Sequence, residues 1–248
     1  MEYDEADREE EEEAEEEEEA ESINEQEVKA ALSRMKNGKA AGEDGIPAEI
    51  YKAGGNEMIR WLTDIFNLAY EQEETPDEWQ YGVICPIYKR KGNKTDCENY
   101  RGITLLAHAG KIYERIIESR LRRQVEEKIG NWQHGFRPGR STVDLVFALK
   151  MLLEKGWEWN QNKYLAFIDL EKAFDRINRE RLWKIMKDEH YGIQPKLVRI
   201  IKNMYKECRN KVKSRQVESN WFDIKTGVRQ GGVLSPLLFI IYCIWTNV

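Results

Sequence analysis

The sequence contains few cysteines and histidines, and their arrangement excludes two kinds of stabilised fold. Its 248 residues include four cysteines and three histidines, with no CxxC pair and no cluster at zinc-ligand spacing. A disulfide-stapled fold and a structural zinc site are therefore not expected, and the scattered thiols are typical of a protein from a reducing compartment. These residues are Cys85, Cys97, Cys208, Cys243, His108, His134 and His190.

Long hydrophobic runs and targeting signals are also lacking. The longest apolar run, Val233 to Trp245, contains Ser235 and Pro236 and is too short to span a bilayer. The N-terminus is acidic rather than basic and then apolar, so we expect no signal peptide. No GxxxxGK segment followed by Ser or Thr is present, so the sequence does not support a kinase or ATPase function. We expect an intracellular protein of the nucleus or cytoplasm, with no membrane partner.

The formal net charge of −6 combines two regions of opposite sign. Residues 1–22 hold fifteen Asp or Glu and one Arg, whereas the remaining 226 residues hold 38 Lys or Arg and 30 Asp or Glu. Like-charge repulsion and the lack of apolar side chains predict a disordered acidic tail over residues 1–22. An inert solubilising tail is favoured there over a mimic of nucleic acid or a segment that recruits a basic partner. The basic remainder favours a polyanionic partner.

Hydrophobic periodicity predicts an α+β fold that is mostly helical with few strands. The first helix is expected to begin with a capping box of Ser22 and Glu25. The strand expected over Trp79–Tyr88 contains Pro86, which marks an edge or an end. Further patterns predict helices around Val28–Met35, Ile112–Leu121, Thr142–Leu153, Ile177–Met186 and Leu197–Tyr205, a helix with an apolar face of Met58, Trp61, Leu62, Ile65, Phe66 and Ala69, a two-stranded ribbon over Lys211–Ile224 and an apolar helix with Pro236 in its first turn.

The stretch Tyr164–Ile168 is a short apolar run, rich in aromatic and branched residues, which predicts a buried strand. The run ends on Asp169, and a lone carboxylate at that place needs water, a cationic partner or a metal ion. Because Mg²⁺ prefers oxygen ligands, Asp169 followed by Phe174 suits a site for Mg²⁺ and a phosphorylated substrate. A surface aspartate that caps the following turn is the alternative, and taken alone it is the simpler one.

Three basic or glycine-rich loops offer contacts for a phosphorylated partner. The segment Lys89–Arg101 carries cations suited to a triphosphate, although a solvated surface loop is the simpler interpretation. The segment Phe136–Arg140 combines cations with an aromatic ring, which suits a nucleic-acid backbone but also an ordinary helix-entry loop. In Gly227–Pro236, a glycine pair lets the backbone approach a flat ligand, to which Gln230 can hydrogen-bond.

Five blocks of the sequence stand in a fixed order: Asp44-Gly-Ile-Pro47; Pro86-Ile-Tyr-Lys89 with Asn99-Tyr-Arg101-Gly-Ile-Thr-Leu105; Gly135-Phe-Arg-Pro-Gly-Arg-Ser-Thr142; Phe167-Ile-Asp169-Leu-Glu-Lys-Ala-Phe-Asp175; and Gly227-Val-Arg-Gln-Gly-Gly-Val-Leu-Ser-Pro236. Together they resemble the reverse transcriptases of non-LTR (LINE-type) retrotransposons. Each block alone is moderately specific, whereas all of them at these separations are very specific. The residues in these blocks are less similar to those of group II intron-type enzymes. The resemblance covers about residues 25–242.

The resemblance implies the fingers and palm of a right-hand polymerase, as an α+β fold that is mostly helical with a small antiparallel sheet. A fingers-like region would span residues 23–160, and a partial palm would span residues 161–248, with the thumb absent. The implied partners are an RNA template, a DNA primer and deoxynucleoside triphosphates. The implied cofactor is Mg²⁺, with two ions in the complete enzyme. The oligomeric state is not indicated.

The resemblance also assigns roles to single residues. Asp169 would be the first catalytic, metal-binding carboxylate, with the backbone carbonyl of Leu170 helping to hold Mg²⁺. Phe174 would crowd the sugar 2′ position, and Gln230 would lie against the incoming nucleotide. Asp175 is typical of the family, and a turn or helix-capping role is at least as plausible for it as a metal role. The phosphate contacts would be Lys89 and Arg101 for the triphosphate, and Arg137 and Arg140 for the template RNA.

The sequence departs from the family after the last block. Two-metal nucleotidyl transfer needs further carboxylates, which the family supplies from an aromatic-x-Asp-Asp hairpin downstream. No Asp or Glu follows Asp223, and Cys243–Val248 does not resemble the family's continuation. We therefore expect a truncated copy that does not polymerise by itself. The alternatives are a non-catalytic RNA-binding remnant and a decayed reading frame without a stable fold.

Overall fold

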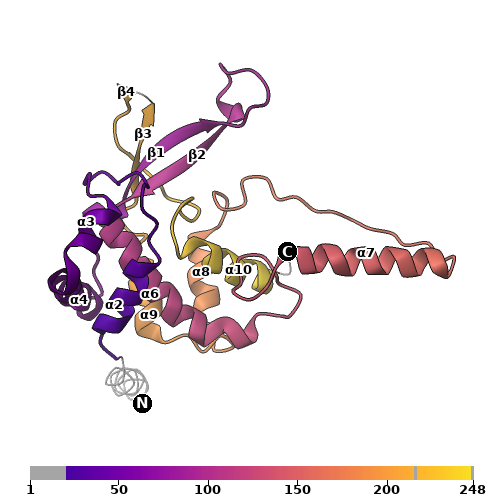
Figure 1. Ribbon diagram of the computed structural model, residues 1–248, viewed down its shortest axis with the longest axis horizontal. Helices are drawn as coiled ribbons and strands as arrows, with labels where there is room; N and C mark the ends of the chain where they lie inside the picture. Colours follow the sequence, from indigo (N-terminus) through magenta and orange to yellow (C-terminus); the bar gives the residue numbers. More distant parts are fainter. Residues whose placement is uncertain (1–20, 215–216, 247–248) are drawn as a thin grey trace, which may run out of the picture.

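The computed structural model describes residues 21–214 and 217–246 and shows a helical body with a projecting β-hairpin and a projecting long helix (Figure 1). Helices and a small sheet together confirm the α+β class. The predicted acidic tail lies, except for Glu21 and Ser22, outside the described residues. In chain order the elements are α2 (Glu25–Ser33), α3 (Ala48–Ala53), α4 (Gly55–Glu71), α5 (Asp77–Gln80), β1 (Tyr81–Tyr88), η2 (Cys97–Asn99), β2 (Tyr100–Leu106), α6 (His108–Val125), η3 (Glu126–Lys128), α7 (Thr142–Glu158), α8 (Arg179–Met186), α9 (Pro195–Asn203), β3 (Arg209–Ser214), β4 (Val217–Glu218), β5 (Phe222–Asp223) and α10 (Ser235–Thr246).

The sheet has the strand order β2-β1-β3-β4, with β5 also paired to β3. The pairing of β1 with β2 is antiparallel, but Tyr81–Ile84 of β1 pairs in parallel with Arg209–Val212 of β3. The expected small antiparallel sheet is confirmed for the pairs β1–β2, β3–β4 and β3–β5 and was wrong for β1–β3, because a long crossover returns the chain beside β1 in the same direction. β1 lies between β2 and β3 and is not an edge strand, but Pro86 lies near its end, beyond the pairs with β3, where its missing N–H leaves no ladder bond to β3 unmade.

The core lies between the helices α2, α4, α6, α8, α9 and α10. These helices pack together below the sheet in Figure 1. Their apolar faces recur at helical spacing, so that each helix buries one stripe. Phe66 of α4 is fully buried and contacts the rings of Trp79 and Tyr113, at centroid distances of 5.6 and 5.4 Å. Burial raises the pKa of the Tyr113 hydroxyl. This aromatic cluster joins α4, α5 and α6.

The first helix begins two residues later than the sequence predicted. The capping box consists of Asn24 and Glu27, not Ser22 and Glu25. The carbonyl of Ser22 instead accepts a hydrogen bond from Arg120 at 3.0 Å, and Ile23 exchanges two backbone hydrogen bonds with the Asn67 side chain. These long-range contacts hold the backbone before Asn24, which a local capping pattern does not reveal.

The buried face of α4 also differs from the predicted one. Trp61 and Ile65 are 63% and 46% exposed, whereas Ile59 and Tyr70 are buried together with the predicted Phe66. The buried face is rotated about the helix axis relative to the predicted one, because α2 and α3 pack against that side of α4. An apolar side chain on the outer face is common in folded proteins.

The predicted strand over Tyr164–Ile168 is not formed. The segment is extended but belongs to no strand, and Tyr164, Phe167 and Ile168 are 92%, 83% and 86% exposed. Composition favours a strand, but a strand also needs a partner for its backbone groups, and none of the described strands lies beside it. Asp169 therefore follows an exposed segment and not a buried strand.

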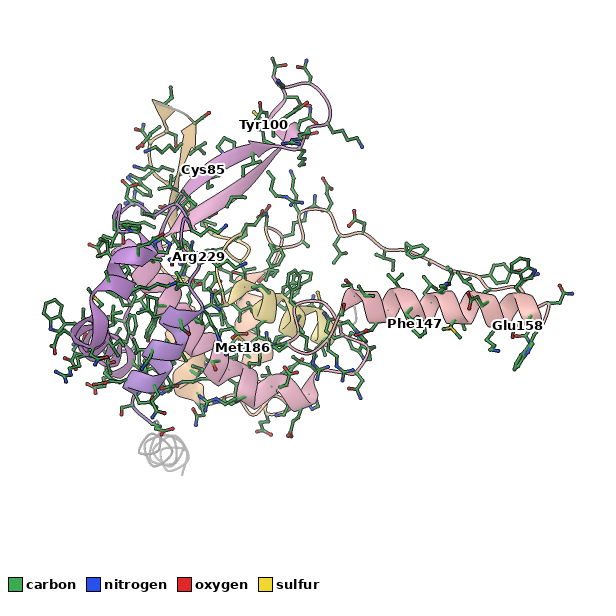
Figure 2. The ribbon with its side chains drawn as sticks, viewed as in Figure 1. Cys85, Tyr100, Phe147, Glu158, Met186 and Arg229 are labelled. Carbon is green, nitrogen blue, oxygen red and sulfur yellow. The ribbon has the colours of Figure 1, made fainter. Side chains whose placement is uncertain are left out.

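Two predicted helices are confirmed with changed ends or surroundings. α7 continues to Glu158 and projects from the body, with Gly156 as its buried residue; Figure 2 shows Phe147 on its exposed surface. α10 follows the glycine-rich turn, with Pro236 in its first turn.

Within residues 21–214 and 217–246, no helix combines the length and apolar composition needed to cross a bilayer.

A buried ion pair ties the glycine-rich loop to α6. Arg229 donates to the carbonyls of Trp79 (2.9 Å) and Met204, and it lies 3.5 Å from the carboxylate of Glu114. Both charged side chains are at most 5% exposed. Burial disfavours the charged guanidinium, but Cys208 and Glu114 outweigh it and hold the pKa of Arg229 above its ordinary value. Figure 2 shows Arg229 inside the body, where these elements meet.

Removing the ring of Phe66 should strongly destabilise the protein. Phe66→Ala is expected to lower the free energy of unfolding by about 3–5 kcal/mol, because it leaves a cavity in the aromatic cluster. Trp61→Ala on the outer face of the same helix should change it by less than about 0.5 kcal/mol. Urea denaturation followed by circular dichroism measures both. Equal losses would show that the observed burial of α4 is incorrect.

Separating the buried ion pair should also be costly. Arg229→Ala is expected to destabilise by about 3–5 kcal/mol, because it leaves the carboxylate of Glu114 buried without its partner. The double variant Glu114→Gln/Arg229→Met should lose less than Arg229→Ala, since neither charge then remains inside. Thermal and urea unfolding give the comparison, and a double variant less stable than the single one would contradict it.

Candidate nucleotide and nucleic-acid site

The glycine-rich loop is fixed to the turn that carries Phe174. The N–H of Gly227 donates to Ile177 at 2.8 Å, and the N–H of Val228 donates to the carbonyl of Phe174 at 2.9 Å. Gly227 has a φ of +77°, and a Cβ there would lie 2.6 Å from the carbonyl oxygen of Phe174. Only glycine satisfies both the backbone angle and this close approach, so the loop and the turn form one unit.

The same loop is fixed on its other side to β2. The N–H of Thr104 donates to the carbonyl of Gln230 at 3.1 Å. Gly231 has a φ of +117°, and a Cβ there would lie 2.7 Å from the carbonyl oxygen of Thr104. The loop therefore lies along the outer edge of β2, and it joins two segments that are about seventy residues apart in the chain.

Two of the predicted nucleotide-contacting residues come together at this junction. The side-chain amide of Gln230 donates to the carboxylate of Asp175 at 2.8 Å. The ring of Phe174 stacks on Phe239 of α10 at 5.1 Å and meets the edge of Phe136 at 6.3 Å. Phe174 is half-buried in this position. The structure thus places Phe174 and Gln230 on adjacent, mutually bonded segments.

Lys89 and Arg101 lie on one face of the β1–β2 hairpin. Arg101 pairs with Ile87, and the N–H of Lys89 donates to the carbonyl of Asn99 at 2.8 Å, so the pairing continues past the end of β1. Because alternate residues share a face, the two cations are diagonal neighbours, about 7–8 Å apart. Both are exposed, and the Lys89 ammonium donates to the carbonyl of Glu98. Arg101 precedes Thr104 by three residues of β2, roughly 10 Å.

Asp169 and Leu170 line a cavity of about 250 Å³ beside α10. Ala173, Phe239 and Tyr242 line it as well, and Phe239 also stacks on the Phe174 ring. Asp169 is exposed. Among the residues that the structure describes, no three His, Cys, Asp or Glu side chains are grouped to hold a metal ion. The donor set present therefore does not fit a two-ion site.

The two arginines predicted to follow the template differ in their surroundings. Arg137 is 8% exposed and donates to the carboxylate of Glu126 at 2.6 Å, to its carbonyl and to the carbonyl of Gly130. Its guanidinium thus holds the loop in place, and a template contact stays a prediction for it. Arg140 is exposed and donates to Asn131 at 2.8 Å through one nitrogen. Arg140 has donors left for a nucleic-acid strand.

Sequence reasoning missed the two side chains that position the loop from below. Glu114 accepts from the N–H of Val233 at 2.7 Å besides pairing with Arg229. A charged residue between the apolar residues Tyr113, Ile116 and Ile117 of an amphipathic helix was a weak signal for a buried partner. The Tyr205 ring faces the Arg229 guanidinium at 4.8 Å, and burial raises the pKa of its hydroxyl to about 12.

Comparison with known proteins matches the sequence to one family. The family described as reverse transcriptase (RNA-dependent DNA polymerase) matches residues 89–244. That range begins at Lys89 of the hairpin and ends in α10, so it contains every residue of the junction described above. It covers more than half of the chain.

Similar full-length proteins come from transposable elements. The probable RNA-directed DNA polymerase from transposon BS of Drosophila melanogaster is 28% identical over 226 residues, which are 89% of this chain and 24% of that protein. The RNA-directed DNA polymerase from mobile element jockey of the same species is 28% identical over 223 residues, with the same two coverages. The chain spans about a quarter of the length of these relatives. The chain belongs to the reverse transcriptase family, and within it to the enzymes of non-LTR retrotransposons, which its five sequence blocks resemble.

Proposed function

We propose that the described residues form the part of an RNA-directed DNA polymerase that holds the incoming deoxynucleotide and the RNA template. The observation that carries this proposal is the junction of the Phe174 turn, the Gln230 loop and β2. Three segments far apart in the sequence are hydrogen-bonded there, below the exposed cations of the hairpin. The fingers-like region would be residues 23–160, and the partial palm would be residues 161–248.

The proposed contacts follow from the chemistry of each side chain. Lys89 and Arg101 present two adjacent cations to a triphosphate, and a guanidinium can donate to two phosphate oxygens at once. Phe174 and Gln230 would face the sugar and base of the nucleotide. Arg140 would contact the template backbone. A DNA primer would complete the set of partners.

Metal binding is the part of the family's chemistry that these residues support least. Asp169 would supply one carboxylate and Leu170 one carbonyl to a divalent ion, and Mg²⁺ accepts such oxygen ligands. In the described chain these donors are not joined by further grouped carboxylates. Since two-ion nucleotidyl transfer needs several carboxylates, we propose that residues 1–248 alone bind substrates but do not polymerise.

The second candidate function is RNA binding without chemistry. It is favoured by the same shortage of grouped carboxylates together with exposed cations such as Arg140. The two candidates differ in one measurable property, because a polymerase site also recognises deoxynucleoside triphosphates. Nucleotide binding that depends on Lys89 and Arg101 would favour the polymerase-derived site.

The exposed arginine of the basic loop should contribute to RNA binding electrostatically. Arg140→Ala is expected to lower the slope of log affinity against log salt by about 0.7, the value for one phosphate contact to a single strand. Arg60→Ala is the matched control, since Arg60 is exposed on α4, away from the hairpin, and pairs with Glu57. Fluorescence anisotropy with a labelled RNA at several salt concentrations gives both slopes. Equal slopes for the two variants would contradict the template role of Arg140.

Purified residues 1–248 should bind RNA and deoxynucleotide without incorporating the nucleotide. The assay combines an RNA template, a DNA primer, deoxynucleoside triphosphates and Mg²⁺, with a viral reverse transcriptase as the positive control. Anisotropy in the same samples reports binding. Robust primer extension that Asp169→Ala abolishes would refute the proposed inactivity, and absence of all binding would refute the proposed function itself.

A further inference from the structure

The amide of Gln230 is held in one orientation by its surroundings. Its nitrogen donates to the carboxylate of Asp175 at 2.8 Å, while its backbone carbonyl accepts from Thr104 at 3.1 Å. An ionised carboxylate can only accept hydrogen bonds, so it must face the NH₂ end of the amide and not the oxygen end. The carbonyl oxygen of the amide is thereby directed away from Asp175.

We propose that Asp175 is a positioning residue that makes Gln230 present a hydrogen-bond acceptor to the bound nucleotide. The inference rests on the proposed function, because it takes Gln230 as a nucleotide contact. It deepens that function by assigning the complementary group: the ligand must offer a donor at this place, namely a sugar hydroxyl or an exocyclic amino group. A ligand with an acceptor there would face an oxygen and be disfavoured.

The turn does not depend on the Asp175 carboxylate for its own shape. Its backbone hydrogen bonds run from the N–H groups of Asp175 and Arg176 to the carbonyl of Lys172, at 3.0 and 3.1 Å. Two further backbone bonds, from Gly227 and Val228, fix the turn to the loop. The carboxylate is exposed. Replacing this side chain therefore removes the hold on Gln230 while the backbone frame persists.

The neighbouring carboxylate offers a contrast within the same segment. Glu171 is also exposed, but it pairs with Arg176 at 3.3 Å on the surface of the turn. Glu171→Gln removes one charge from the same segment without touching Gln230. It is therefore the matched control for a general electrostatic effect of Asp175 on a polyanionic ligand.

The hydrogen bond itself can be tested without any ligand. In ¹⁵N-labelled protein, the side-chain amide signals of Gln230 are assigned by their loss in Gln230→Ala. They are expected to shift in Asp175→Ala and in the isosteric Asp175→Asn, and to stay unchanged in Glu171→Gln. Unshifted signals in both Asp175 variants would overturn the proposal, whatever the nucleotide result.

The consequence for binding is tested by a double-mutant cycle with a fluorescent deoxynucleoside triphosphate labelled on its γ-phosphate. Asp175→Ala is expected to weaken binding about three- to tenfold, the range of one net hydrogen bond. In the Gln230→Ala background the same change should have no effect, since the residue to be positioned is gone. A merely structural role would weaken binding in both backgrounds and would overturn the proposal.

The outcomes separate this inference from the function on which it rests. If the wild-type chain fails to bind the probe, or Lys89→Ala/Arg101→Ala binds it as well as the wild type does, the proposed function fails. The amide signals then still decide whether Asp175 orients Gln230. If the wild type binds and the cycle is additive, the function stands and the positioning role of Asp175 falls.

Discussion

The buried pairing of Glu114 with Arg229 is the interaction on which the rest of this structure depends. The pair lies where α6, the end of α5, the end of α9 and the glycine-rich loop meet. Two charges inside a protein are tolerated only while they remain together and hydrogen-bonded. Movement of the loop would separate them, so the loop is held in place by the cost of an unpaired internal charge.

This constraint explains why the outer side of the loop can serve as a rigid platform. Below it, Glu114 accepts from Val233 and pairs with Arg229; above it, Gln230 is bonded to both Thr104 and Asp175. The loop needs glycine at its close contacts, and glycine alone would leave it free to move. Fixed partners on both sides remove that freedom, and a binding site gains from such preorganisation.

The arginines of the chain fall into two groups: some are paired with carboxylates within the fold, and others are exposed. The excess of basic residues beyond residue 22 overstates the cations available to a polyanion, because many arginines hold the fold together. Their partners are carboxylates of other elements or of the same helix. These pairs are Arg120–Glu27, Arg122–Glu118, Arg137–Glu126, Arg199–Glu73 and Arg229–Glu114. Arg101 and Arg140 are exposed, and they are the cations on which the proposed phosphate contacts rest.

Local patterns in the sequence were sufficient for the helices and for the order of the functional blocks. Apolar residues at helical spacing located α6, α8 and α9, since such a stripe must be buried wherever the helix lies. Contacts between distant residues could not be predicted from such local patterns. The hydrogen bond from Arg120 to the carbonyl of Ser22 accompanies a helix cap that lies two residues after the predicted one, and the packing of α4 leaves Trp61 exposed. The site was predicted as separate residues; Glu114 lies outside the five blocks, and Thr104 lies in one of them without a role that the sequence could assign.

The failed strand over Tyr164–Ile168 and the isolated Asp169 have one physical explanation. An apolar, β-branched segment specifies a strand only in combination with a neighbour that satisfies its backbone. The described chain provides no such neighbour, and it also groups no carboxylates with Asp169. A strand paired beside this segment would satisfy the backbone, cover the exposed rings and bring its own side chains to the end where Asp169 stands. The lone carboxylate and the unpaired segment therefore have one cause in the described residues: no strand pairs with the segment that leads to Asp169.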